Sequence, residues 1–254
     1  MALNGKKVAA VIEVRMTSSR LPGKPLLTAG GKPLLQILVE RLRRVRRIDQ
    51  IAVATTVNAA DDPIVELAGN IGAAAFRGSE QDVLRRVCDC LKWQRADVCV
   101  EITGDCPLAD PAIVDEALDA FTRTPDCVYV SNSDPHRSVP AGLDAQVFSA
   151  YALFQLERET SDPVDREHVS HGFYRPESGG RWRPVFIKHA STAGAEFFWL
   201  SLDYREDYEL IKALHEDLGA KNENYGAREI IAWVRAHPGM HERCLKLRPG
   251  WGGP

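Results

Sequence analysis

Residues 8–25 read VAAVIEVRMTSSRLPGKP, and this stretch decides the fold. Its first seven residues are mostly apolar and rich in β-branched side chains, which predicts a buried strand. The polar segment that follows carries three cations, Arg15, Arg20 and Lys24. Ligands of open α/β sheets bind beyond the carboxyl ends of the strands, so we expect this loop to bind phosphate. A solvated basic turn is the alternative interpretation.

The loop differs from the two common phosphate-binding loops. Lys24 is followed by Pro25 where a Walker A sequence has Ser or Thr, and Ser18 stands where its first glycine would be. The chain also contains no G-x-G-x-x-G dinucleotide fingerprint. The cations are therefore expected to contact phosphate oxygens directly, arginine through its planar guanidinium and lysine as a point charge.

Composition excludes several classes of protein. The 254 residues carry a net charge of -3 and are 44% hydrophobic, which suits one large α/β domain with a sizeable core. The protein is not basic overall, so its charge gives no indication that it binds nucleic acid. Its apolar runs are too short for a membrane span, and its N-terminal residues predict a strand instead of a signal peptide. Six cysteines form no C-x-x-C pair, as is usual for reduced, buried thiols. We expect a cytoplasmic protein with neither nucleic acid nor membrane as partner.

Strand and helix patterns alternate through the first half of the chain. This alternation predicts right-handed βαβ units and a Rossmann-like α/β fold, with a mostly parallel mixed sheet flanked by helices. We expect one domain over residues 1–245, acceptor-binding and dimerisation elements within 132–195, and a peripheral tail at 246–254. Further expected elements are helices at 33–46, 150–159, 165–174, 207–218 and 227–235, and strands at 182–187 and 197–202.

Two aspartates follow predicted strands. Asp105 lies in a Gly-Asp turn after VCVEIT, and Asp203 follows FFWLSL. An aspartate bonded to its own turn is the alternative for Asp105, and Glu206 or Asp207 could be ordinary acids of a helix N-terminus. Two carboxylates brought to one rim by separate strands can hold Mg²⁺ and leave positions for phosphate oxygens. The sequence therefore predicts a magnesium site at Asp105 and Asp203.

Several segments together resemble a known family, the cytidylyltransferases that make CMP-activated sugars, and above all its branch named after the spore-coat polysaccharide protein SpsF. They are RMTSSRLPGKPL (15–26), GGKPLLQILVERL (30–42), VATTVNAADDPIVELA (53–68), FRGSEQDVLRR (76–86), ITGDCPLADP (102–111) and GLDAQVF (142–148). The chain departs from this branch at Thr17, where the branch has glycine, and at Glu13, where it often has glutamine.

The resemblance implies an enzyme that transfers CMP from CTP to a small sugar and releases pyrophosphate. It also implies Mg²⁺ as cofactor, a homodimer, and a role in surface polysaccharide synthesis with an acidic keto sugar as acceptor. One alternative is a nucleotidyltransferase of the same fold that acts on a sugar phosphate or a phosphonate. Another is a non-catalytic nucleotide-sugar-binding subunit, although such a module would not need both Asp105 and Asp203. A GT-A glycosyltransferase is a third, but no D-x-D follows a core strand.

The resemblance and the strand ends together give the expected site residues. Ser79 and Asp82 could also cap a helix, and His168 and His171 could be packing histidines. We expect catalysis by Arg15, Arg20 and Lys24, and metal binding by Asp105 and Asp203. The expected nucleotide-binding residues are Val14, Arg15, Met16, Thr17, Ser18, Lys24, Thr55, Asn58, Gly78, Ser79, Asp82, Arg86, Thr103 and Asp105, and the expected acceptor-binding residues are Arg137, Gly142, Asp144, Glu167 and His168.

Overall fold

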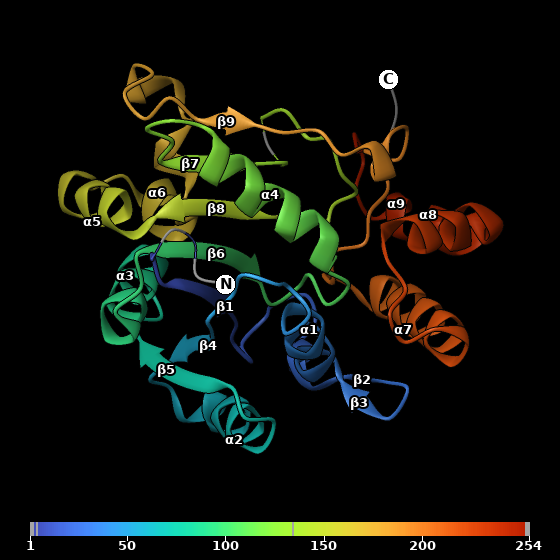
Figure 1. Ribbon diagram of the computed structural model, residues 1–254. Coiled ribbons are helices and arrows are strands. Elements are labelled where there is room, and N and C mark those ends of the chain that lie inside the picture. Colours follow the sequence, from blue (N-terminus) through green and yellow to red (C-terminus); the bar gives the residue numbers. More distant parts are fainter. Residues whose placement is uncertain (1–2, 4, 134, 252–254) are drawn as a thin grey trace.

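A seven-stranded sheet runs through the centre of the protein in the order β5-β4-β1-β6-β8-β7-β9 (Figure 1). The computed structural model describes residues 3, 5–133 and 135–251. Strand β8 is antiparallel to both of its neighbours, and the other pairings are parallel, which confirms the predicted mostly parallel mixed sheet. The strands are β1 (Val8–Glu13), β4 (Gln50–Thr56), β5 (Ala74–Gly78), β6 (Val98–Thr103), β7 (Tyr129–Ser131), β8 (Gln146–Ser149) and β9 (Val185–Phe186), with a separate pair β2 (Thr28–Ala29) and β3 (Lys32–Pro33).

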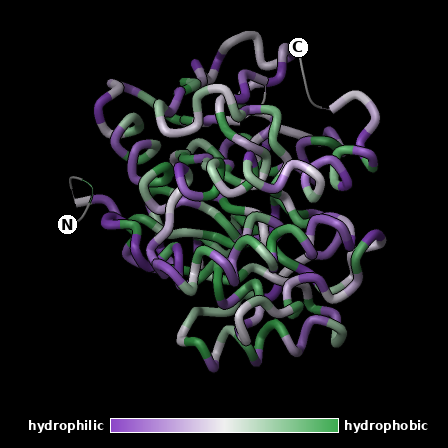
Figure 2. The backbone as a smooth tube through the Cα atoms, turned by 90° about the vertical axis from the view of Figure 1, so that its right-hand side faces the viewer, coloured by the Kyte–Doolittle hydropathy of each residue, from purple (hydrophilic) through white to green (hydrophobic). Residues whose placement is uncertain are grey.

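Helices cover both faces of the sheet, so apolar residues concentrate in the interior (Figure 2). Side chains of β1 alternate between the faces: Val8, Ala10 and Ile12 pack in one core cluster, and Ala9 and Val11 in the other. The first cluster is completed by α1, α4 and α7 to α9, and the second by α3 and α5. The helices are α1 (Leu34–Leu42), α2 (Asp62–Asn70), α3 (Val83–Gln94), α4 (Pro111–Arg123), α5 (Ala150–Glu159), α6 (Pro163–Glu167), α7 (Arg205–Lys221), α8 (Ala227–Ala236) and α9 (Pro238–Lys246).

The strand register fixes where the loops leave the sheet. Glu13, the last residue of β1, is level with Ala54 of β4 and Thr103 of β6. All three strands are parallel, so the segments that follow them emerge at one edge. The cationic loop after β1 and the Gly-Asp turn after β6 are therefore neighbours, as the sequence predicts.

Several predicted boundaries are wrong in the second half of the chain. The helix expected at 165–174 is the short α6 followed by a 3₁₀ turn, His171–Phe173, and the strand expected at 182–187 is only the two-residue β9. The strand expected at 197–202 forms a single bridge, from Trp199 to Ala141. Its aromatic residues pack on the C-terminal region instead: Phe198 stacks edge-on against His241 of α9, a helix the sequence analysis did not predict.

Two further boundaries differ near the ends of the chain. Pro33 belongs to β3, so the helix expected at 33–46 is the shorter α1. Two residues of the tail expected to be peripheral contact the rest of the protein: the Arg248 side chain is only 9% exposed, and the Trp251 ring lies 4.6 Å from that of Trp199. Leu247 is exposed. Residues 252–254 of that tail lie outside the described residues. No helix among the described residues combines the length and apolar character that a membrane crossing requires.

Candidate active site

The cationic loop after β1 is fastened to its neighbours by backbone contacts. The N–H of Val14 donates to the Ala54 carbonyl of β4, and the N–H of Gly104 donates to the Glu13 carbonyl at 2.8 Å. Gly23 has a φ of 73°, in the left-handed region that glycine adopts most easily, and its N–H donates to the Met16 carbonyl. These contacts fold the loop back so that Lys24 faces the strand ends.

A cavity of about 370 Å³ opens between this loop and the strand ends. It brings together nine of the predicted site residues, from four separate segments of the chain. Glu13, Ser19 and Gly104 also line it. The predicted residues in its wall are Val14, Arg15, Ser18, Arg20, Lys24, Arg86, Thr103, Asp105 and Glu167.

An ionic cluster lies on the rim of this cavity. The Lys24 ammonium is 3.6 Å from a carboxylate oxygen of Asp105 and 3.6 Å from one of Asp203. Lys24 also donates to the Leu202 carbonyl at 2.7 Å, and Arg20 donates to Asp203 at 2.6 Å. A third cation, Arg248, lies 3.7 Å from Asp203. The structure thus brings both predicted metal ligands to a single cation.

The donor set at this rim suits a magnesium ion that shares its ligands with phosphate. Among the described residues, no group of three or more His, Cys, Asp and Glu is arranged to hold a metal by itself. Mg²⁺ is usually bound through one or two carboxylates plus substrate phosphates and water, so Asp105 and Asp203 would suffice. Asp203 faces three cations, whereas within the described part of the chain Asp105 pairs only with Lys24. Asp105 is therefore the less neutralised of the two carboxylates.

Several predicted nucleotide-binding residues meet on one acid that the sequence analysis did not select. Glu80 accepts hydrogen bonds from Asn58 at 2.7 Å and from Thr17 at 3.3 Å, and it lies 3.7 Å from Arg15. Thr17 thus has a defined polar contact at the position where the SpsF branch has glycine. Glu80 ties the loop after β1 to the loops after β4 and β5.

The loop from β5 to α3 supplies a second group of predicted residues. Arg86 is only 3% exposed and donates to the Ser79 carbonyl at 2.5 Å. Gly78 packs so closely on Arg86 that an added Cβ would lie 2.9 Å from its side chain, which explains glycine there. Ser79 accepts from the Asp82 N–H at 3.1 Å, and Asp82 caps α3 and bonds Arg166 at 3.1 Å. Thr55 is fully buried in β4, and Met16 is half-buried.

A buried pair of carboxyl groups lies at the floor of the cavity. Glu13 and Glu101 stand on the same face of β1 and β6, and their side chains share a hydrogen bond. Burial raises the pKa of Glu101 well above its usual range, and the adjacent Glu13 carboxyl raises it further. Burial also raises the pKa of Glu13, although the Glu101 hydrogen bond and the charge of Arg86 oppose this. The glutamate at position 13 is therefore held by its neighbours, not turned to solvent.

The predicted acceptor-binding residues fall into two places. Arg137 pairs with Asp144 at 2.6 Å, and Asp144 also accepts from the Gly142 N–H at 2.9 Å. The Arg137 guanidinium lies over the ring of Trp251, 5.3 Å from its centroid. Glu167 lines the cavity, but the exposed His168 is not among the residues of its wall. Of these two neighbouring predicted residues, only Glu167 therefore lies in the cavity wall.

Comparison with known proteins agrees with this geometry. The family described as "Cytidylyltransferase" matches residues 9–227 of the chain. The spore coat polysaccharide biosynthesis protein SpsF of Bacillus subtilis is 31% identical over 234 residues, which cover 90% of this chain and 94% of that protein. The 3-deoxy-manno-octulosonate cytidylyltransferase of Psychrobacter is 32% identical over 202 residues, 74% of this chain and 70% of that one.

A solved structure supports the same assignment. The structure of a cytidylyltransferase from Leptospira borgpetersenii superposes with a TM-score of 0.84 at 28% identity, covering 93% of this chain and 97% of that one. The similarity therefore extends over nearly the whole fold and includes the cationic loop and both aspartates. The chain belongs to the cytidylyltransferase family and is a CTP-dependent nucleotidyltransferase.

Proposed function

We propose that this enzyme transfers CMP from CTP to an acidic keto sugar, with release of pyrophosphate, in the synthesis of a surface polysaccharide. The observation that carries the proposal is the position of Lys24, 3.6 Å from both Asp105 and Asp203 on the rim of a cavity lined by two further cations of the same loop. The relatives support the acceptor class, because one is named for a spore coat polysaccharide and another for a keto sugar acid.

The chemistry follows from where charge develops. A hydroxyl oxygen of the sugar forms a bond to the α-phosphorus, the bond from that phosphorus to the pyrophosphate oxygen breaks, and the hydroxyl proton is released to solvent. Arg15, Arg20 and Lys24 offset the negative charge that accumulates on the non-bridging and leaving oxygens. Lys24 and Arg20 are oriented by their ion pairs with Asp203, and oriented charges of this kind need little reorganisation in the transition state.

We also propose that Mg²⁺ binds at Asp105 and Asp203 when the nucleotide is present. The ion would supply positive charge to the phosphate oxygens. Lys24 and Arg20 form ion pairs with these carboxylates, which orients both of them at the rim of the cavity. A homodimer, which the family resemblance implies, stays a prediction that sedimentation of the purified protein would test.

The acceptor is proposed to bind between the ionic cluster and the cluster of Arg137, Gly142 and Asp144. Arg137 has a planar guanidinium that suits a carboxylate, and Asp144 and Trp251 hold it in a defined orientation. Glu167 closes the cavity on its other side and can accept hydrogen bonds from sugar hydroxyls. This arrangement favours a polyhydroxylated acid over a neutral sugar.

The decisive experiment is pyrophosphate release by the purified protein. CTP and Mg²⁺ would be supplied with sialic-type and Kdo-type sugars, sugar phosphates and phosphonates, and each active acceptor would be repeated with the other three nucleoside triphosphates. We expect release with CTP and one keto sugar acid. Release only with a sugar phosphate or phosphonate would replace the proposed acceptor class, and binding of CTP without release for any acceptor would favour a non-catalytic role.

A further inference from the structure

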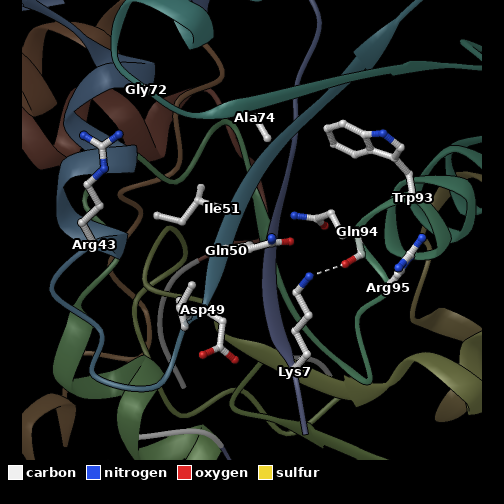
Figure 3. Close-up of a pocket in the computed structure, with 11 residues that line it drawn as sticks. Lys7, Arg43, Asp49, Gln50, Ile51, Gly72, Ala74, Trp93, Gln94 and Arg95 are labelled. Carbon is white, nitrogen blue, oxygen red and sulfur yellow. Dashed lines mark hydrogen bonds between the residues drawn. The ribbon is translucent and has the colours of Figure 1, made fainter.

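A second and larger cavity lies at the opposite end of the strands (Figure 3). Its volume is about 740 Å³, compared with about 370 Å³ for the active-site cavity. It forms where β1, β4 and β5 begin and where α1 and α3 end, and no residue lines both cavities. Because β1 runs from this cavity to the catalytic loop, the full length of a core strand separates the two.

Three cations line this second cavity without an acidic partner. Among the described residues, Lys7, Arg43 and Arg95 form no ion pair within 4.0 Å. By contrast, the surface residues Arg46 and Arg85 each contact a carboxylate, at 3.0 and 2.8 Å. The cavity wall has one acid, Asp49, and this carboxylate accepts the backbone N–H of Val8 at 2.8 Å. The cavity wall therefore carries more positive than negative charge, although Arg43 donates to the Ile71 carbonyl and its charge also acts on Glu40.

A buried amide in the same wall has an unfilled hydrogen-bonding position. Gln94 is 5% exposed, and its Nε2 has no hydrogen-bond partner among residues 3, 5–133 and 135–251. Its other amide atom contacts only the Cys90 thiol at 3.7 Å, so one polar atom stays unpaired whichever way the amide is turned. The amide extends from the end of α3 toward Gln50 of β4 (Figure 3). A buried polar group without a partner destabilises the fold, and a ligand that paired with it would recover that cost.

The cavity also offers an aromatic surface. Trp93 is 55% exposed, an unusual exposure for so large an apolar side chain. Its ring contacts Phe76 with the ring centroids 5.8 Å apart, which restrains its orientation. Lys7 donates to the Gln94 carbonyl at 2.7 Å and retains two further N–H groups (Figure 3). Cations, an amide and a flat ring thus surround one space.

We propose that this cavity is a second ligand site and that it binds a nucleoside phosphate. The phosphate would contact Lys7 and Arg95, and the planar base would stack on Trp93. Arg43 lies on the opposite side of the cavity and donates to the Ile71 carbonyl, so it is not assigned to the phosphate (Figure 3). The Gln94 amide would hydrogen-bond a polar edge of the base. A nucleoside phosphate matches all these features at once, whereas a simple anion would leave Trp93 and Gln94 without a role. The proposal does not depend on the sugar that the active site uses.

The test is calorimetric titration of the full chain with CMP. We expect two equivalents of CMP for the wild type. Trp93→Ala or Arg95→Ala should weaken one of the two sites by about 10-fold or more, since each removes a stacking or charge-assisted contact, and should leave the other site unchanged. Arg46→Ala, an exposed cation outside the cavity, is the matched control and should leave both sites unchanged.

Two results would overturn the proposal. One is a single equivalent of CMP in the wild type whose affinity the cavity variants leave unaltered. The other is equal binding of inorganic phosphate and CMP with no effect of Trp93→Ala, because a general anion site would then suffice. Turnover of CTP by the Arg95→Ala variant, measured alongside, should match the wild type in the absence of added CMP, which shows that the variant folds.

Discussion

Asp61 accepts a hydrogen bond from the backbone N–H of Met16 at 2.7 Å, and this bond fixes the catalytic loop to the exit of β4. The same carboxylate accepts from the N–H of Thr56 at 3.1 Å and from its hydroxyl at 2.5 Å. Asp61 is 1% exposed and stands at the N-cap of α2, but within the described part of the chain its side chain makes no capping bond to that helix. It positions the loop that carries the cations.

Replacing Asp61 should therefore affect both activity and stability. Burial disfavours the Asp61 carboxylate, but the hydrogen bonds from Met16 and Thr56 outweigh it and lower the pKa. Because the pKa is lower in the folded protein than in the unfolded chain, the Asp61 carboxylate stabilises the fold at pH values above the unfolded pKa. This stabilisation is lost as the pH falls through the folded pKa. We expect Asp61→Ala to lose about 1–3 kcal/mol near neutral pH and less in acid, as measured by urea unfolding. Asp62→Ala, which replaces the exposed neighbour, should change neither activity nor stability. If Asp61→Ala lost as much stability in acid as at neutral pH, the ionic explanation would be contradicted.

The effect of Glu101 on the stability of the protein depends on pH with the opposite sign to that of Asp61. Its raised pKa means that the folded protein keeps a proton that the unfolded chain has released. Stability is then greatest below the unfolded pKa and falls by about 1.4 kcal/mol per pH unit until the folded pKa is passed. Glu101→Gln removes the ionisation but keeps a hydrogen-bond donor for Glu13. The melting temperature of this variant should exceed that of the wild type by a margin that grows with pH, and a constant margin would refute this assignment.

Lys24 is expected to act mainly on the transition state. Its ammonium contacts two carboxylates and a carbonyl at the cavity rim, yet the side chain is still 15% exposed. Lys24→Ala should reduce turnover of CTP by about 10²–10³-fold, as for other preorganised donors, while the circular dichroism spectrum is unchanged. Lys32→Ala, an exposed lysine paired with Glu40, serves as the control. Turnover within a factor of a few of the wild type would remove Lys24 from the catalytic set.

Gly142 is predicted to tolerate no side chain. Its φ is +98°, and an added Cβ would lie 2.5 Å from the backbone carbonyl of Leu200. Neither backbone can move easily, because the Leu200 N–H donates to the Ala141 carbonyl at 2.7 Å and the Ala141 N–H donates to the Phe198 carbonyl at 3.0 Å. Gly142→Ala should destabilise the protein by more than about 3 kcal/mol, from strain and clash together, as measured by thermal unfolding. Gly179→Ala, also at positive φ but with open space around it, should lose far less.

Arg248 connects the C-terminal segment to the ionic cluster. It contacts Asp207 at 2.5 Å and lies between the rings of Trp199 and Tyr204, at 4.1 and 5.1 Å. Asp207 is 1% exposed, so Arg248→Ala would leave a buried carboxylate without its cation and should cost about 3–5 kcal/mol. Arg248→Lys should restore part of the stability measured by urea unfolding. Arg243→Ala, a cation of the same region that is half exposed, is the control, and an equally large loss there would argue against a specific role for Arg248.

The sequence predicts the first half of the molecule well because its signals there are local. The strand before Arg15, the Gly-Asp turn at Asp105 and the capped start of α4 each depend on neighbouring residues, and parallel strands then bring them to one edge. Asp61, Glu80 and Arg248 were missed because their roles depend on partners distant in the chain. The region 182–202 was misjudged for a related reason: its aromatic residues pack on α9, so their spacing does not report a strand.

The bond between Arg20 and Asp203 joins residues 183 positions apart. Closing so long a segment of chain requires most of the intervening structure to be in place, and contacts of this range form slowly. The βαβ units around β1, β4 and β6 depend on much shorter segments and can form first. During refolding, helix and strand signals should therefore recover before any capacity to turn over CTP, and an intermediate with a complete sheet would still be catalytically silent.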